Sequence, residues 1–177
     1  MITMKILGTE EIIANTVRMR RALEGAAGKA LNSRVLRIRR TAILMTPKVT
    51  GDLISSCFAI GTQGGVIAGA SPTFLGYSPA DPARLQADHA EAIAVESRAV
   101  LLKRKIGVIS VAVGYSAYYA AYVHEDPNAG KGKNRNHRNK KKRSSSRGQW
   151  KFLETAAQAT FKWIYLDIKE EFRKEFR

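Results

Sequence analysis

The stretch that decides the fold is residues 9–47, TEEIIANTVRMRRALEGAAGKALNSRVLRIRRTAILMTP. Thr9 followed by two glutamates is typical of a helix N-terminus, and Pro47 disfavours helix in the residue before it. Apolar residues recur between these limits at roughly helical spacing, namely Ile13, Val17, Leu23, Ala27, Leu31, Leu36, Ile38 and Ala42. Basic residues are predicted on another face, namely Arg18, Arg21, Lys29, Arg34, Arg37 and Arg40. The sequence therefore predicts a long helical region, either bent or divided in two near Gly25 and Gly28, because glycine weakens a helix by about 1 kcal/mol relative to alanine.

The rest of the chain predicts shorter elements. Apolar patterning and turn residues indicate an edge strand at 4–7, a turn at 50–52 and two strands around Gly64–Gly65 within 56–70. A loop is expected at 71–84 and a short helix at 84–97. A β-hairpin formed by 100–102 and 106–113 around a basic turn follows, and an amphipathic helix at 149–176 closes the chain. Alternation along 106–113 places its β-branched residues on one face, so we expect this strand to be central in a sheet.

Composition fits one globular domain spanning 1–177, with 45% hydrophobic residues. The single cysteine, Cys57, excludes an intramolecular disulfide and is predicted to be a small buried residue. The chain starts without a signal-peptide pattern, so we expect it to fold in a cytoplasm. The uncharged apolar run 106–123, which is near membrane-spanning length, is interpreted as a strand and a short helix, so no membrane segment is predicted.

The formal charge of +15 favours a polyanionic partner, most commonly DNA or RNA. More than half of this excess lies in residues 131–147, a run without acidic or aliphatic residues. Its nine cations are Lys131, Lys133, Arg135, Arg138, Lys140, Lys141, Lys142, Arg143 and Arg147. Two interpretations stay open: a solvated loop, or a contact to phosphates or to a neighbouring protein. The run has no aromatic residue, so any DNA contact should be sequence-independent and made without base stacking.

Catalytic and metal-binding patterns are absent from the sequence. The three histidines and one cysteine offer no zinc spacing, and there is no GxSxG, P-loop or GxGxxG motif. His124-Glu125-Asp126 is better interpreted as polar residues at a helix end than as acid–base machinery. We therefore expect no enzymatic activity, no catalytic residue, no metal and no cofactor.

Three segments carry a more specific pattern. The first is Thr46-Pro47-Lys48-Val49-Thr50-Gly51-Asp52-Leu53-Ile54-Ser55-Ser56, in which Pro47, Thr50, Gly51, Leu53 and Ser56 form P-x-x-T-G-x-L-x-x-S. The second is Val113-Gly114-Tyr115-Ser116 followed by Tyr119-Ala120-Ala121-Tyr122-Val123-His124-Glu125. The third is Gly148-Gln149-Trp150-Lys151-Phe152-Leu153-Glu154. Pro47 should stop the first helix, and Leu53 should return to the core.

In this order the three segments resemble the neck, or tail-completion, proteins of long-tailed bacteriophages, also described as head–tail joining proteins or minor tail components. Trp150 departs from the family pattern, which has a small residue there. Residues 63–105 and 126–147 fall outside the motifs and are interpreted as an insertion and a basic loop. In the second segment, Tyr119, Tyr122 and Val123 share a helical face and are first interpreted as core. Tyr118, His124 and Glu125 are then the candidate subunit contacts.

The resemblance implies an α+β subunit with a long N-terminal helix, a small antiparallel β-sheet and a long C-terminal amphipathic helix packed on the sheet. It also implies a structural virion protein, assembled in the host cytoplasm, that forms a homo-oligomeric ring in the neck. A sixfold or twelvefold ring would contact the head connector or stopper on one side and the tail terminator or tube on the other. The alternative, motivated by charge alone, is a stand-alone nucleic-acid-binding protein.

Overall fold

The computed structural model describes residues 8–47, 51–74, 81–129 and 151–175. The elements in chain order are α1 (Thr9–Met45), α2 (Asp52–Ser55), β1 (Cys57–Ile60), β2 (Val66–Ala68), α3 (Pro82–Lys105), β3 (Ala112–Tyr115), α4 (Ala120–Glu125), α5 (Phe152–Phe161) and α6 (Ile164–Lys174). The expected α+β class is confirmed. The strand expected at 4–7 lies outside the described residues.

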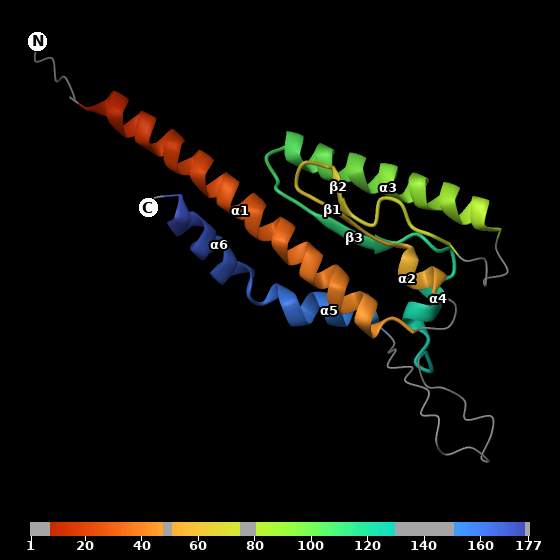
Figure 1. Cartoon of the computed structure of the whole chain (residues 1–177). Coiled ribbons are helices and arrows are strands. Elements are labelled where there is room, and N and C mark those ends of the chain that lie inside the picture. Colours follow the sequence, from red (N-terminus) through yellow and green to blue (C-terminus); the bar gives the residue numbers. More distant parts are fainter. Residues whose placement is uncertain (1–7, 48–50, 75–80, 130–150, 176–177) are drawn as a thin grey trace, which may run out of the picture.

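The molecule is layered around α1 (Figure 1). The sheet lies between α1 and α3, and α5 and α6 pack along the other side of α1. On one face of the sheet, Phe58 and Ile60 pack with Val100 of α3. On the other face, Val113 and Tyr115 contact the cluster formed by Ile38, Ala42 and Ala156. Both faces are covered, and every residue of β1 is buried.

The sheet is antiparallel in the order β2-β1-β3. Cys57 pairs with Tyr115 and Ile60 with Ala112. The expected pair of strands around Gly64–Gly65 is confirmed, because Gly64 N–H donates to the Gly61 carbonyl at 2.9 Å and closes the turn. The expectation that 106–113 supplies the central strand is wrong. The buried strand β1 is central, and β3 is an edge strand.

Helix α1 is continuous from Thr9 to Met45, so of the two expected alternatives, one bent helix or two helices, the division near Gly25 and Gly28 is wrong. Its end before Pro47 is as predicted. The core face differs from the predicted one, because Ile13, Val17, Leu23 and Leu36 are exposed. The buried positions are Ala26, Ala30, Arg34, Val35, Ile38 and Ala42. Small residues meet on this face, where Ala42 packs with Ala156 of α5, whereas the sequence pattern predicted larger apolar residues there.

The hairpin expected at 100–113 is also wrong, because α3 continues through Lys105. Asp81 caps its start by accepting from Ala83 N–H at 3.2 Å. Leu85, His89 and Val100 are the fully buried positions of one helical face. The basic residues 103–105 occupy the last turn, where cations interact favourably with the negative end of the helix dipole. Residues 100–102, which we predicted to be a strand, are therefore part of helix α3.

The expected single C-terminal helix is divided into α5 and α6. Buried Arg34 of α1 reaches the break, where its Nη1 donates to the Thr160 carbonyl at 2.9 Å and its Nη2 pairs with Asp167. In a continuous helix that carbonyl would accept from residue 164. Here it receives Arg34 and, at 3.4 Å, Trp163 N–H. The predicted apolar position Phe161 is consequently exposed at the break.

Candidate assembly surface

The three sequence motifs, far apart in the chain, meet in one cluster, which we call the motif cluster. Its buried residues are Leu53, Ala117, Ala120 and Phe152, and the partly buried residues packed on them are Met45, Tyr115, Tyr119, Val123 and Leu153. Each motif supplies part of it: α2 lies within the first, α4 belongs to the second and α5 begins in the third. The motif residues Phe152, Leu53, Tyr119, Val123 and Leu153 therefore have a packing role.

The end of α1 is joined to the sheet beside this cluster. Thr46 is buried, and its hydroxyl donates to the Ala42 carbonyl at 2.7 Å. Because a hydroxyl has one proton, Tyr115 must donate the 2.7 Å bond between the two side-chain oxygens. Burial raises the pKa of the Tyr115 phenol, so the phenol stays protonated and able to donate. Burial also raises the pKa of the neighbouring Cys57 thiol to about 11, in keeping with its predicted role as an inert core residue.

Local backbone features hold the motifs together. Gly51 has a φ of 85°, a conformation suited to glycine, at the start of α2. Ser56 is buried and donates through its hydroxyl to the Leu53 carbonyl at 2.8 Å. Lys151 adopts a left-handed φ of 51°, and its N–H donates to the carbonyl of His124 at 2.7 Å. That bond joins the end of α4 to the start of α5. Pro47 is buried as well.

Of the predicted surface residues, Tyr118 is 54% exposed and Glu125 is also exposed. His124 is half-buried, and its Nδ1 lies 2.8 Å from Glu125 Oε1. Its ring contacts Phe152 edge-on at 5.0 Å. The interpretation of Tyr122 as core is wrong, because it is 79% exposed. Tyr118 and Tyr122 thus expose two aromatic side chains to solvent, next in sequence to Tyr119 and Val123 of the motif cluster.

Several predicted sites lie outside the described residues. These are Thr50 of the first motif, Gly148, Gln149 and Trp150 of the third, and all nine cations of residues 131–147. Their candidate roles stay predictions.

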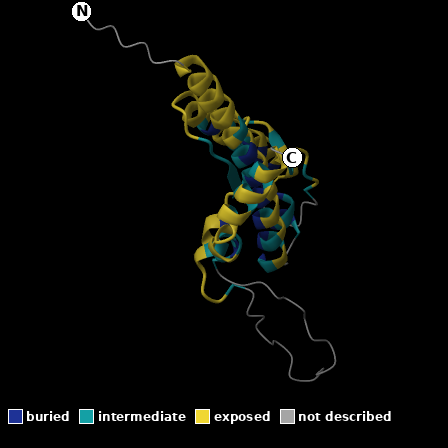
Figure 2. Ribbon diagram, turned by 90° about the vertical axis from the view of Figure 1, so that its left-hand side faces the viewer, coloured by how far each residue is buried: buried dark blue, intermediate teal, exposed yellow. Residues whose placement is uncertain are grey.

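Two exposed apolar surfaces were not predicted. The first, the apolar stripe, consists of Ile12, Met19 and Leu23 on α1, which repeat near helical spacing and are each about half or more exposed. The second, the aromatic corner, surrounds the α5–α6 break and consists of Phe161, Trp163, Tyr165 and Leu166. Figure 2 shows the first turns of α1 exposed on all sides, projecting beyond the packed part of the molecule.

A histidine that the sequence did not single out organises the sheet and α3. His89 is buried, with Nδ1 2.6 Å from Ser116 Oγ and Nε2 2.7 Å from the Gly69 carbonyl. A carbonyl only accepts, so Nε2 carries the proton and Nδ1 is free to accept from the Ser116 hydroxyl. No carboxylate is among the bonded partners of this ring, as a serine–histidine–acid triad would require. We interpret this contact as structural.

Within the described residues, no group of three His, Cys, Asp or Glu side chains could hold a metal ion. No helix in that part of the chain is both long and apolar enough to cross a bilayer. No known protein family, no characterised protein and no solved structure matches the chain closely enough to establish a relationship. The resemblance to neck proteins therefore depends on the three motifs alone.

Proposed function

We propose that this chain is a structural subunit of the neck ring that joins the head to the tail of a tailed bacteriophage. Its function would then reside in contacts between subunits and not in a catalytic pocket. The observation that carries this proposal is the pair of exposed apolar surfaces, the apolar stripe and the aromatic corner. Exposed apolar patches on soluble proteins mark interaction sites. The resemblance of the three motifs to neck proteins is the reason for proposing the neck and not another assembly.

A ring also needs a suitable arrangement of these surfaces. The apolar stripe and the aromatic corner lie on different elements, α1 and the α5–α6 break. Contact between one surface of a subunit and the other surface of its neighbour is heterologous, and such contacts close into rings when the rotation permits. Tyr118 and Tyr122, above the motif cluster, are candidates for contacts to the connector or tail proteins.

Self-association tests the subunit contact. We expect the full chain to form an oligomer by mass photometry and the Ile12→Lys/Leu23→Lys variant to be monomeric, because charge in a desolvated apolar contact is costly. The matched control is Asn15→Lys/Ser33→Lys, which adds the same charge at exposed positions of α1. An oligomer distribution that is the same in both variants would contradict a role for the apolar stripe.

Cryo-electron microscopy of intact particles tests the location. We expect the chain in density between the head connector and the tail, arranged as a closed ring. Purified particles that lack the chain would overturn the proposal. Deletion of residues 131–147 should leave folding intact, and a normal yield of infectious particles after deletion would exclude a required role for that run.

The alternative is a stand-alone nucleic-acid-binding protein, favoured by the net charge of +15. It predicts tight binding of DNA or RNA by the monomer, with log affinity falling linearly as log salt rises. The two proposals separate cleanly, because the neck proposal requires the chain in particles and the alternative does not.

A further inference from the structure

A cleft opens between α1 and the end of α3, on residues that neither the motifs nor the assembly surfaces use. Its volume is about 620 Å³. Five of the side chains that line it are cationic: Arg20, Arg21, Lys29, Arg104 and Lys105. Glu24 is the single acidic residue among those lining it. We call this site the basic cleft.

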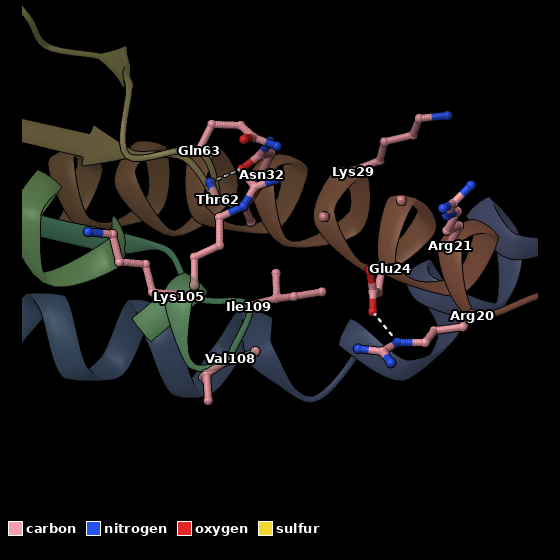
Figure 3. Close-up of a pocket in the computed structure, with 14 residues that line it drawn as sticks. Arg20, Arg21, Glu24, Lys29, Asn32, Thr62, Gln63, Lys105, Val108 and Ile109 are labelled. Carbon is pink, nitrogen blue, oxygen red and sulfur yellow. Dashed lines mark hydrogen bonds and ion pairs between the residues drawn. The ribbon is translucent and has the colours of Figure 1, made fainter. Parts of the chain in front are cut away.

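Figure 3 shows how these side chains lie. Lys105 is on one side of the cleft and Arg20 and Arg21 are on the other. Thr62 lies between them, with its N–H donating to the Asn32 side chain at 2.9 Å. The cleft thus joins cations from two helices that are more than seventy residues apart in the sequence. The bond from the Thr62 N–H to the Asn32 side chain fastens the turn after β1 to α1.

Two of the cations already have acidic partners. Arg20 pairs with Glu24 at 2.8 Å, and Lys29 pairs with Glu175. No ion pair within the described residues involves Arg21, Arg104 or Lys105. The described residues carry 18 Lys and Arg against 15 Asp and Glu, a net charge of only +3. The cleft thus gathers three cations that have no ion pair with a described acidic residue.

The two glycines that did not break α1 form part of the cleft wall. Gly25 and Gly28 both line it, and a Cβ added at Gly25 would meet no atom within 4 Å. Packing therefore does not require glycine at position 25. Glycine there costs about 1 kcal/mol of helix stability relative to alanine, and its effect in the folded chain is to keep the cleft wall free of a side chain.

We propose that the basic cleft binds the phosphate backbone of nucleic acid. Guanidinium groups match phosphate oxygens in paired hydrogen bonds. The cations without ion pairs come from two elements, Arg21 from α1 and Arg104 and Lys105 from the end of α3, so an extended polyanion can contact both. None of the lining residues is aromatic, so the proposed contact is to phosphates and does not involve base stacking. The site goes beyond the proposed neck function, and residues 131–147 are not among its lining residues.

The test measures duplex DNA binding across a salt series, in full chains whose nine cations in residues 131–147 are changed to Gln. We compare Arg21→Gln/Arg104→Gln/Lys105→Gln with the control Arg40→Gln/Arg84→Gln/Arg98→Gln, which removes the same charge from exposed positions elsewhere. The cleft variant should bind about tenfold more weakly at low salt, and its slope of log affinity against log salt should fall by about 2 to 3. The control should retain both.

A second pair tests the cleft wall. Gly25→Glu and Gly25→Gln have similar helix propensity, so both should fold, but they differ in charge. Only Gly25→Glu should weaken DNA binding strongly. Equal losses in the cleft and control triple variants would show attraction to bulk charge and overturn the proposal. Absence of DNA binding at low salt would also overturn it, as would full competition by inorganic phosphate at matched ionic strength. None of these results bears on the presence of the chain in particles.

Discussion

The pairing of Arg34 with Asp167 makes a directional prediction about stability. The Arg34 side chain is 4% exposed, whereas that of Asp167 is 25% exposed. Asp167→Ala leaves a buried guanidinium without its carboxylate, which costs about 3 to 5 kcal/mol in comparable sites. The remaining bond to the Thr160 carbonyl places the expected loss of unfolding free energy near the lower limit, about 3 kcal/mol. Arg34→Met leaves a carboxylate that water can reach, so we expect a loss of about 2 kcal/mol or less.

Two measurements check this order. Urea denaturation gives the unfolding free energies, and hydrogen exchange locates the change. Helix α6 has no fully buried residue, so the loss should be local, with amide exchange in α6 about a hundredfold faster for Asp167→Ala. The Arg34→Met/Asp167→Ala double variant should be more stable than Asp167→Ala alone. The control Lys174→Ala removes the two ion pairs of an exposed lysine, with Glu170 and Glu171, and should change stability by less than about 0.5 kcal/mol. Equal losses for the two single variants, or unchanged α6 exchange, would refute the reasoning.

Three further predictions concern the sheet, the glycines and the motif cluster. The unfolding free energy should fall as pH rises from about 9 to 11, because the unfolded Cys57 thiol ionises near pH 9 while burial keeps it protonated when folded. Burial of the Tyr115 phenol lowers the unfolding free energy in the same direction above pH 10, so Cys57→Ala should reduce this decline without abolishing it. An unchanged decline in the variant would contradict the assignment to the thiol. Gly69→Ala should destabilise the fold by about 2 kcal/mol or more in thermal denaturation, since φ at this position is 76° and the added Cβ would lie 2.3 Å from the Cys57 carbonyl oxygen. Gly25→Ala should instead stabilise the fold by up to about 1 kcal/mol. Leu53→Ala should cost about 3 kcal/mol by leaving a cavity beneath the meeting point of the motifs, and a loss below 1 kcal/mol by urea titration would mean that the cluster is not a packed core.

Local signals in the sequence predicted the parts of the fold that local chemistry controls. Pro47 ends α1 as expected, and Gly61, Gly64 and Gly65 place the turn between β1 and β2. The three motifs that resemble a family also meet in one packed cluster, although no local pattern predicted that Tyr122 would be exposed.

Features that depend on contacts between distant segments were not predictable from local patterns. The division of the C-terminal helix follows from Arg34, a residue that its charge placed on the solvent face. The full length of α3 follows from packing of Val100 on the sheet, which outweighed the strand propensity of its neighbours. The basic cleft joins residues of α1 and α3 that no single stretch of sequence brings together.

The continuity of α1 has a mechanical consequence. A helix of 37 residues is a rod about 55 Å long. One end carries the apolar stripe, and the other is fastened to the sheet through Thr46 and Tyr115. A neighbouring subunit bound to the free end would therefore exert a torque on the whole helix, and the helix would transmit the rotation to the motif cluster at its other end. In a closed ring, such rods would tilt together, and the opening of the ring would change with their common angle.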